Sequence, residues 1–288
     1  MTELNRDTNI LIVGLGLIGG SYAKALTKKG YKINAISKEQ SDIDFAISEG
    51  FIADGTTDKL EEFIKAADLI ILALYPHTLI KWVEENRNFF KSGTIITDVT
   101  GVKEFIINKV QALMPENVEF IAAHPMAGRE KSGVRYSDDS VFKNANYIIV
   151  PTEKNSEHAK EICKKLGFEL GFHNISILNA KEHDEMIAFL SQLTHCIAVS
   201  LMCTGETDGF EAYTGDSFRD LTRIAKINDE MWSELFLCNK EALLHKMNDF
   251  SKQFEIFKKA LESNDRETMR KMMKKSTLRR EKFDKTQK

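Results

Sequence analysis

Short apolar segments alternate with amphipathic ones through the first half of the chain. Segments 18–30, 76–90 and 101–114 have helical periodicity and lie between runs that are predicted to be buried strands. Strands that alternate with helices are typical of a parallel sheet covered on both faces. The predicted strands are 9–14, 31–37, 68–74, 93–99, 118–124 and 144–151.

The pattern changes after Pro151. One more helix–strand unit is predicted, with a helix at 156–167 and a strand at 168–176. From residue 178 onward the chain is helical in pattern and contains no proline. We therefore predict an α/β Rossmann-type, dinucleotide-binding class of domain at 1–176, followed by an all-α helical domain at 177–288.

Composition narrows the class of protein. The 288 residues are 42% hydrophobic and 29% charged, which suits two globular domains. We expect no membrane span, no secretory signal and, at a formal net charge of -3, no nucleic-acid partner. The basic stretch at 269–288 is predicted to be a solvated terminal helix. The four cysteines lack metal-site or disulfide spacing, which favours reduced thiols in the cytoplasm.

The first predicted strand ends in a glycine-rich turn, "GLGLIGGS". Gly14, Gly16 and Gly19 have the G-x-G-x-x-G spacing, directly after a strand and at the start of a helix. This is the context in which glycines permit a tight turn and let the backbone approach a pyrophosphate at a helix N-terminus. We predict that Gly14, Gly16, Ile18 and Gly19 bind a nicotinamide dinucleotide.

The end of the second predicted strand bears on the choice between NAD and NADP. An NAD-selective site usually places an acid there to bond the ribose 2′-hydroxyl. Here the segment reads "NAISKEQ", with Ser37 and Lys38 before the first acid, Glu39. A hydroxyl beside a cation accommodates a 2′-phosphate, so we predict that the cofactor is NAD or NADP, with NADP used at least as well as NAD.

His124 lies at the end of a predicted buried strand, in "IAAHPMAG". A lone histidine there is ordinarily a capping or core residue. In a dinucleotide-binding sheet, however, residues beyond the carboxyl ends of the later strands face the nicotinamide. Oxidation of an alcohol needs a base for the hydroxyl proton, and imidazole suits that task near neutral pH. We therefore predict that His124 is catalytic.

Five separated motifs extend this interpretation. They are "GLGLIGGS", "TDVTGVK", "HPMAGREKSG", "EHDEMIAFLSQLTH" and "SFRDLTRIA" followed by "MW". In this order they resemble the prephenate dehydrogenase family over nearly the whole chain. The resemblance implies oxidation of the C4 alcohol of prephenate by NAD(P), with loss of the ring carboxylate, to give 4-hydroxyphenylpyruvate and CO₂ in tyrosine biosynthesis. It also implies that the first domain, 1–176, binds NAD(P), and that the helical domain, 177–288, binds substrate and forms a homodimer.

The resemblance assigns roles to particular residues. His124 corresponds to the catalytic histidine that bonds the C4 hydroxyl, and Arg223 to the arginine that holds the ring carboxylate. His195 corresponds to a histidine near the side-chain carboxylate of the substrate, and Trp232 to a tryptophan that lines the site. Thr100 is a candidate for a substrate contact, because Gly101 replaces the serine of the family's D-x-G-S-x-K segment.

Other departures leave alternatives open. Gln192 and Thr194 replace the first histidine and the proline of an S-H-L-P-H element, and Asp216 replaces a glycine near the substrate. Arogenate therefore remains an alternative substrate, and another β-hydroxyacid-type dehydrogenase is an alternative enzyme. A dinucleotide sensor without turnover would not need His124, His195 and Arg223. The histidines lack metal-ligand spacing, and no catalytic metal is expected.

Overall fold

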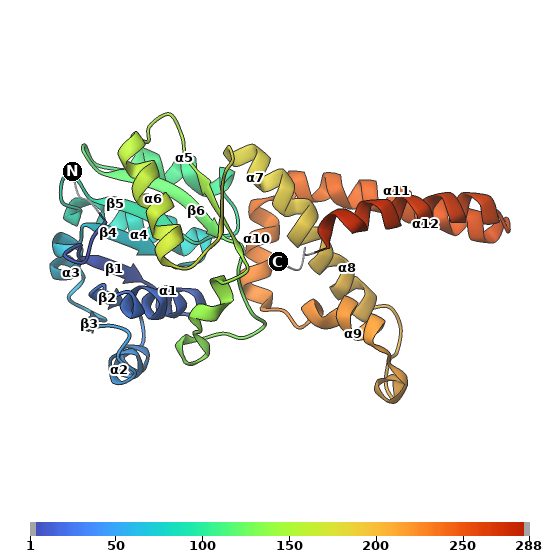
Figure 1. The fold of residues 1–288 in the computed structure, drawn as a ribbon, viewed down its shortest axis with the longest axis horizontal. Coiled ribbons are helices and arrows are strands. Elements are labelled where there is room, and N and C mark those ends of the chain that lie inside the picture. Colours follow the sequence, from blue (N-terminus) through green and yellow to red (C-terminus); the bar gives the residue numbers. More distant parts are fainter. Residues whose placement is uncertain (1–3, 285–288) are drawn as a thin grey trace. The chain divides into compact units, whose positions relative to one another are not determined.

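The computed structural model describes residues 4–284 and contains one sheet of eight strands in that range (Figure 1). The strand order is β3-β2-β1-β4-β5-β6-β7-β8. Neighbouring strands from β3 to β6 are parallel, β7 is antiparallel to β6, and β8 is parallel to β7. The strands are β1 (Ile10–Val13), β2 (Ile33–Ile36), β3 (Asp54–Thr56), β4 (Leu69–Leu72), β5 (Ile95–Asp98), β6 (Glu119–Pro125), β7 (Asn146–Val150) and β8 (Asn174–Ile177).

Helices cover both faces of this sheet, as predicted. Side chains of a strand alternate between faces, so Ile10 and Ile12 join one buried cluster while Leu11 and Val13 join another. Residues of α1, α2 and α6 belong to the first cluster, and residues of α3, α4 and α5 to the second. The helices are α1 (Leu17–Lys28), α2 (Gln40–Ser48), α3 (Leu60–Ala66), α4 (Pro76–Asn86), α5 (Glu104–Leu113) and α6 (Glu157–Glu169).

Three features of the sheet domain differ from the sequence prediction. The elements α2, β3 and α3 were not predicted, because β3 is a three-residue edge strand, Asp-Gly-Thr, without an apolar run. Strand β7 runs antiparallel to β6. The strand predicted at 168–176 is wrong in its first half, since α6 continues to Glu169.

Gly167 explains the third difference. It lies inside α6, and a Cβ there would come within 2.7 Å of the Tyr147 ring. The glycine therefore serves close packing of helix on sheet. The left-handed residue that follows the helix is Gly171, at φ +97°.

The chain is helical after β8. The elements are α7 (Ala180–Ile187), a π-helical turn (Ala188–Gln192), α8 (Leu193–Met202), α9 (Asp216–Thr222), α10 (Asp229–Cys238), α11 (Lys240–Glu262) and α12 (Arg266–Arg280). The predicted boundary at 176/177 lies where the sheet ends, whereas the two compact units of the chain are Met1–Asn239 and Lys240–Lys288. Residues 1–3 and 285–288 lie outside the described range. The second of these ranges is the end of the basic segment 269–288, which was predicted to be a solvated terminal helix.

One helical segment among the described residues, Ala180–Met202, is long and apolar enough to cross a membrane by length and composition. A single such helix is weak support for a span, because core helices meet the same criterion. This segment carries buried His183, Asp184 and Gln192, all of which hydrogen-bond to other parts of the chain. The absence of a membrane span stays a prediction.

Candidate functional site

The glycine turn joins β1 to α1 at the carboxyl edge of the sheet. Gly14 has φ +99°, and a Cβ there would lie 2.4 Å from the carbonyl oxygen of Ala73. A Cβ at Gly19 would lie 1.9 Å from the Gly14 oxygen, so both positions require glycine. At Gly16, by contrast, a Cβ would meet no atom within 4 Å. Gly16 therefore faces open space, where the backbone can approach a ligand.

The start of α1 suits a negatively charged ligand. Gly16 is the N-cap and provides no side-chain cap, and the first turn has no acidic residue. The N–H groups of a first helical turn, including that of Ile18, have no partner within the helix, and the helix dipole adds partial positive charge. These features fit the pyrophosphate of a dinucleotide.

Ser37 and Lys38 follow β2, the neighbour of β1 in the sheet. The backbone N–H of Ser37 donates to the Thr56 carbonyl at 3.2 Å, which fixes the chain at this point. Ser37 is partly exposed and Lys38 is exposed. Both therefore lie at the strand end where the adenosine ribose of a dinucleotide is expected.

A buried ion pair supports the loop after β5. The Lys103 Nζ lies 2.7 Å from Asp98 Oδ2, and both side chains are completely buried. The Thr100 hydroxyl lies 2.5 Å from the same Asp98 oxygen and 3.0 Å from the Val102 carbonyl. Asp98 Oδ1 also accepts the backbone N–H of Ala123 at 3.1 Å, which ties this loop to β6 next to His124.

These contacts change the interpretation of Thr100. Its hydroxyl is engaged by Asp98, Val102 and Lys103, and the residue is buried. The geometry therefore gives Thr100 a role in shaping the loop, and a substrate contact by its side chain would require these bonds to break. That contact stays a prediction without support from the geometry.

His124 lies near the end of β6 and belongs to a chain of three side chains. Its Nδ1 lies 2.9 Å from Nε2 of His183, and Nδ1 of His183 lies 2.7 Å from Oδ1 of Asp184. Asp184 also accepts the backbone N–H groups of Lys103 at 2.8 Å and Glu104 at 2.9 Å, at the start of α5. The carboxylate thus caps α5 and orients His183 at the same time.

This arrangement determines the tautomers of both rings. A carboxylate only accepts, so His183 must donate from Nδ1, and a neutral His183 then accepts at Nε2. His124 consequently donates from Nδ1, and its Nε2 carries the free lone pair. An imidazole with a free Nε2 is the form that a general base requires.

Burial keeps both imidazoles in the neutral form. The pKa of His124 lies well below its ordinary value, mainly because the ring is removed from water, with further lowering by His183 and Lys103. The pKa of His183 is also lowered by burial, which outweighs the opposing effect of its hydrogen bond to Asp184. Burial therefore favours neutral His124, which is the form that can accept a proton.

The other predicted residues meet around α8 and α10. The His195 ring stacks on Trp232, with ring centroids 3.7 Å apart, and His195 Nδ1 bonds the Ser191 carbonyl at 2.9 Å. Burial lowers the pKa of His195, and the opposite charges of nearby Glu130 and Arg223 act on it as well. The Arg223 guanidinium forms an ion pair with Glu130, in the loop that follows β6. His195, Trp232 and Arg223 therefore form one group that extends to the His124 loop.

Gly101 links this group to His124. A Cβ at Gly101 would lie 3.6 Å from Leu235 of α10 and 3.9 Å from Cε1 of His124. The position therefore lies between α10 and the imidazole, and it has room for a small side chain.

Two of the other three departures, Gln192 and Asp216, have clear structural surroundings. Gln192 is buried, donates to the Leu235 carbonyl at 2.9 Å and accepts from Asn239 at 2.8 Å, so it fastens the π-helical turn to α10. Asp216 is at the surface, where it pairs with Arg219 at 2.8 Å and its side chain is 91% exposed.

Sequence reasoning did not assign three residues of the site. His183, Asp184 and Glu130 lie within motifs that were identified, but their contacts depend on pairs far apart in the chain. An adjacent His-Asp pair in the first turns of an amphipathic helix was the available signal. Both residues turned out to be buried, which a solvated helix face would not show.

A glycine turn at the edge of a parallel sheet, with an oriented neutral histidine at the same edge, defines a dinucleotide-dependent dehydrogenase. Residues 22–176 match the nucleotide-binding domain of prephenate dehydrogenase, and residues 179–275 match its dimerization domain. The chain belongs to the prephenate dehydrogenase family.

Individual relatives agree with this assignment. The prephenate dehydrogenase of Bacillus subtilis is 30% identical over 271 residues, which span 92% of this chain and 72% of the relative. The crystal structure of prephenate dehydrogenase from A. aeolicus with hydroxyphenyl propionate and NAD+ has a TM-score of 0.89 at 29% identity, covering 98% of this chain and all of that one. Synechocystis arogenate dehydrogenase has a TM-score of 0.81 at 25% identity, covering 96% of this chain and all of that one.

Proposed function

We propose that this dehydrogenase converts prephenate into 4-hydroxyphenylpyruvate and CO₂ with NAD(P)+ as oxidant, in tyrosine biosynthesis. The observation that carries the proposal is the chain from Asp184 through His183 to His124, which leaves His124 Nε2 free as a base at the carboxyl edge of the sheet. A bound dinucleotide would supply the hydride acceptor for C4 of the substrate, and the residues of the chain would transfer the proton and position the carboxylate.

His124 is proposed to accept the proton of the C4 hydroxyl and later to return it to the same oxygen. Its Nε2 takes the proton of the C4 hydroxyl as hydride leaves C4, so that the hydroxyl becomes a carbonyl. When the ring carboxylate departs as CO₂, its bonding pair enters the ring, and the carbonyl oxygen takes the proton back from Nε2. The product is a phenol, and no net proton is released. Aromatisation supplies the driving force, which leaves positioning and electrostatics to the protein.

Arg223 is proposed to hold the ring carboxylate through two parallel hydrogen bonds. It now pairs with Glu130, so the substrate must replace or share that partner. His195, stacked on Trp232, is proposed to lie beside the side-chain carboxylate. The proposed role of Arg223 is to orient the ring carboxylate. Very strong stabilisation of the carboxylate would oppose its release as CO₂.

The direct test measures absorbance of the reduced nicotinamide with prephenate or arogenate and with NAD+ or NADP+. Turnover of prephenate supports the proposal, and exclusive turnover of arogenate would assign the chain to the alternative substrate. Tight dinucleotide binding without turnover of either compound would indicate a sensor.

The Asp184 carboxylate is predicted to act through tautomer control. Asp184→Asn exchanges one acceptor oxygen for a donor NH₂, which favours His183 with its proton on Nε2 and therefore His124 with its proton on Nε2. We expect kcat to fall by roughly 10²–10⁴-fold with little change in KM, because the base is blocked while substrate contacts remain. Steady-state kinetics measures both constants.

Glu185→Gln is the matched control, because it makes the same chemical change on an exposed position of the same helix. Asp184 also caps α5, so the melting temperature of each variant should be recorded. A folded Asp184→Asn variant with normal kcat would contradict the tautomer assignment.

The cofactor prediction depends on Ser37 and Lys38. We expect wild-type protein to use NADP+ at least as well as NAD+. Ser37→Asp should shift preference toward NAD+, because a carboxylate repels a 2′-phosphate and accepts a bond from a 2′-hydroxyl. The ratio of kcat/KM for the two cofactors is the measurement. A wild-type preference for NAD+ of about a hundredfold, or about 2.7 kcal/mol, would contradict this interpretation of the strand end.

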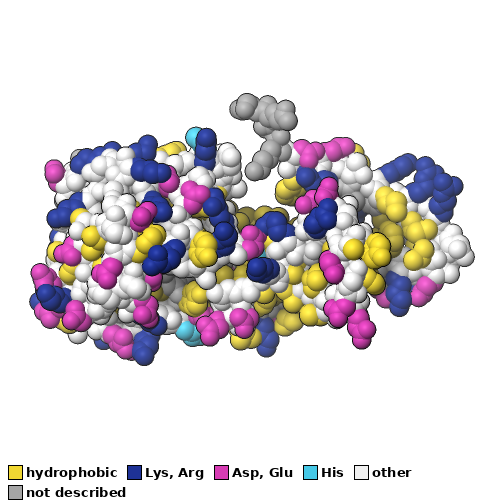
Figure 2. Space-filling model, turned by 90° about the horizontal axis from the view of Figure 1, so that it is seen from below, with side chains coloured by type: hydrophobic (Ala, Val, Ile, Leu, Met, Phe, Trp, Pro, Cys, Tyr) yellow, Lys and Arg dark blue, Asp and Glu magenta, His cyan; other side chains and the backbone are white. Residues whose placement is uncertain are grey.

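We infer that the protein is a homodimer formed through its helical region. The match to a dimerization domain supports this, as do exposed apolar side chains on the helices after β8, visible as yellow patches in Figure 2. Examples are Phe189, Leu190, Leu221, Leu237, Phe250, Phe254 and Leu261. Light scattering at micromolar concentration should give twice the chain mass, and the interface should bury more than about 1,000 Å². A monomer would contradict the inference.

We also place the enzyme in the cytoplasm. All four cysteines are free thiols in the structure, which accords with a reducing compartment.

A further inference from the structure

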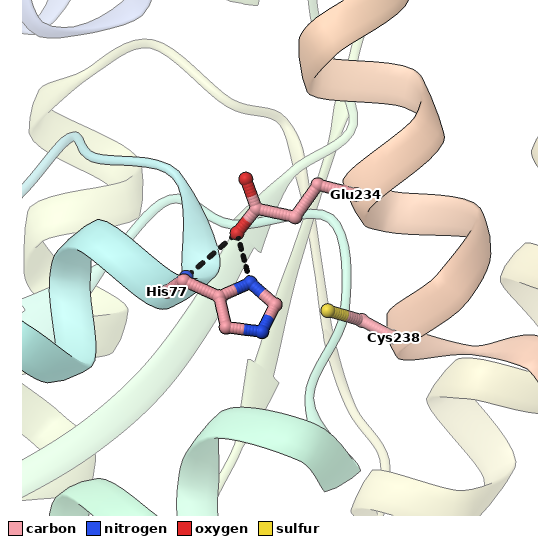
Figure 3. Close-up of side chains that lie close together, drawn as sticks. All are labelled: His77, Glu234 and Cys238. Carbon is pink, nitrogen blue, oxygen red and sulfur yellow. Dashed lines mark hydrogen bonds and ion pairs between the residues drawn. The ribbon is translucent and has the colours of Figure 1, made fainter.

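A histidine, a glutamate and a cysteine meet beside α4 and α10, apart from the proposed catalytic residues. His77 is the second residue of α4, and Glu234 and Cys238 lie one turn apart on α10 (Figure 3). Glu234 Oε1 accepts the backbone N–H of His77 at 2.7 Å and lies 2.7 Å from His77 Nδ1. One potential ligand atom from each of the three residues lies within 4.8 Å of the other two.

We propose that His77, Glu234 and Cys238 form a binding site for Zn²⁺, with water as the fourth ligand. Imidazole nitrogen, carboxylate oxygen and thiolate sulfur are the three ligand types that zinc takes in proteins. Thiolate excludes Mg²⁺ and Ca²⁺ as preferred ions, because both favour oxygen ligands. Three protein ligands and one water is the usual composition of an open zinc site.

The distances suit a tetrahedral ion after small side-chain movements. Zinc bonds of about 2.0–2.3 Å hold ligand atoms about 3.4–3.6 Å apart. The observed separations of up to 4.8 Å must close slightly, and the 2.7 Å contact of Glu234 with His77 must open. Both changes require rotation of the side chains. Glu234 and Cys238 project from the same face of α10 because they are four residues apart.

The charges around the thiol also favour a cation. The negative charges of Glu234 and Asp184 lie near the thiol of Cys238, together with the positive charge of Lys109. A thiol beside a carboxylate is an environment that a divalent cation relieves, because it replaces the thiol proton and neutralises both anions. The His77 side chain is 65% exposed, so an ion can enter from solvent.

An ion at this position would join α4, which packs on the sheet, to α10, which carries Trp232 and Leu235. Trp232 stacks on His195, and Leu235 lies against Gly101. Zinc binding is therefore expected to stabilise the contact of α10 with the sheet domain. Stabilisation by a ligand that binds only the folded state appears as a rise in melting temperature.

The test uses the full-length, tag-free protein stripped with a chelator and titrated with Co²⁺ as a spectroscopic substitute for zinc. We expect one Co²⁺ per chain, a thiolate-to-cobalt charge-transfer band, and loss of that band when Zn²⁺ is added. Zinc should raise the melting temperature of wild-type protein. Neither substrate nor dinucleotide is present, so the outcome does not depend on the proposed function.

Cys238→Ser should abolish the charge-transfer band and the thermal shift, and His77→Ala should weaken binding more than about 10-fold. Cys203→Ser is the matched control, since it removes an exposed thiol elsewhere and should leave both readouts unchanged. His77 is largely exposed, so its variant keeps the test valid if Cys238→Ser is unstable. The proposal is overturned by a cobalt spectrum without a thiolate band, by a band that persists in Cys238→Ser, or by a band that disappears in Cys203→Ser.

Discussion

His124→Asn is expected to lower kcat for prephenate by roughly 10²–10⁴-fold, the usual contribution of a general base. Asparagine keeps hydrogen-bonding groups of similar size but cannot take up the proton of the C4 hydroxyl. KM should change little, because the hydroxyl is one of several contacts of the substrate. Steady-state kinetics with prephenate at saturating dinucleotide separates the two constants.

The pH profile gives a second readout of the same residue. A base acts in its neutral form, so kcat/KM of the wild type should be level at high pH and fall as the pH drops through the pKa of His124. Burial, His183 and Lys103 all lower that pKa, and the fall should therefore occur at more acidic pH than for an ordinary histidine. The His124→Asn variant should lack this acidic limb.

His173→Asn is a suitable control, because it makes the same substitution at an exposed position of the sheet domain. It should leave kcat and the pH profile unchanged. Near-normal kcat with an unchanged profile in His124→Asn would show that His124 is structural, and the mechanism would then need another base.

Strands of the sheet domain could be predicted from the sequence where they are buried on both faces. Strands β1 and β4 are central and apolar, so each produces a clear hydrophobic run. Strand β3 lies at the sheet edge and contains polar residues, and nothing in its pattern marks it. The direction of β7 also escaped prediction, because an antiparallel strand buried on both faces has the same apolar run as a parallel one.

The site could be predicted only as separate candidates. Chain position relative to strand ends identified Gly14 and His124, and motif order identified Arg223 and His195. The contacts of His124 with His183 and of Arg223 with Glu130 join residues 59 and 93 positions apart. Such pairs follow from tertiary packing and not from any local periodicity. For the same reason no sequence pattern places His77 near Glu234, because the two residues are 157 positions apart.

Arg223→Ala should act mainly on substrate binding, in contrast to His124→Asn. Removal of the guanidinium leaves the ring carboxylate without its charge-assisted partner, and we expect KM for prephenate to rise roughly 10–100-fold, or about 1.4–2.8 kcal/mol. Arg223→Lys should recover part of this loss, because lysine keeps the charge but cannot form two parallel bonds. The dissociation constant of the dinucleotide, measured by fluorescence or calorimetry, should not change.

The ion pair between Arg223 and Glu130 leads to a further expectation for the KM of prephenate. In the structure Glu130 occupies the guanidinium that the ring carboxylate needs, so the two carboxylates compete for Arg223. Glu130→Gln should weaken that competition and lower KM for prephenate in a background that has Arg223. In the Arg223→Ala background the same substitution should have no such effect, so the two changes should be non-additive. If Glu130→Gln lowered KM equally in both backgrounds, or if Arg223→Ala left KM unchanged, the ring carboxylate would be bound elsewhere, and the helical region would have to supply a different cation.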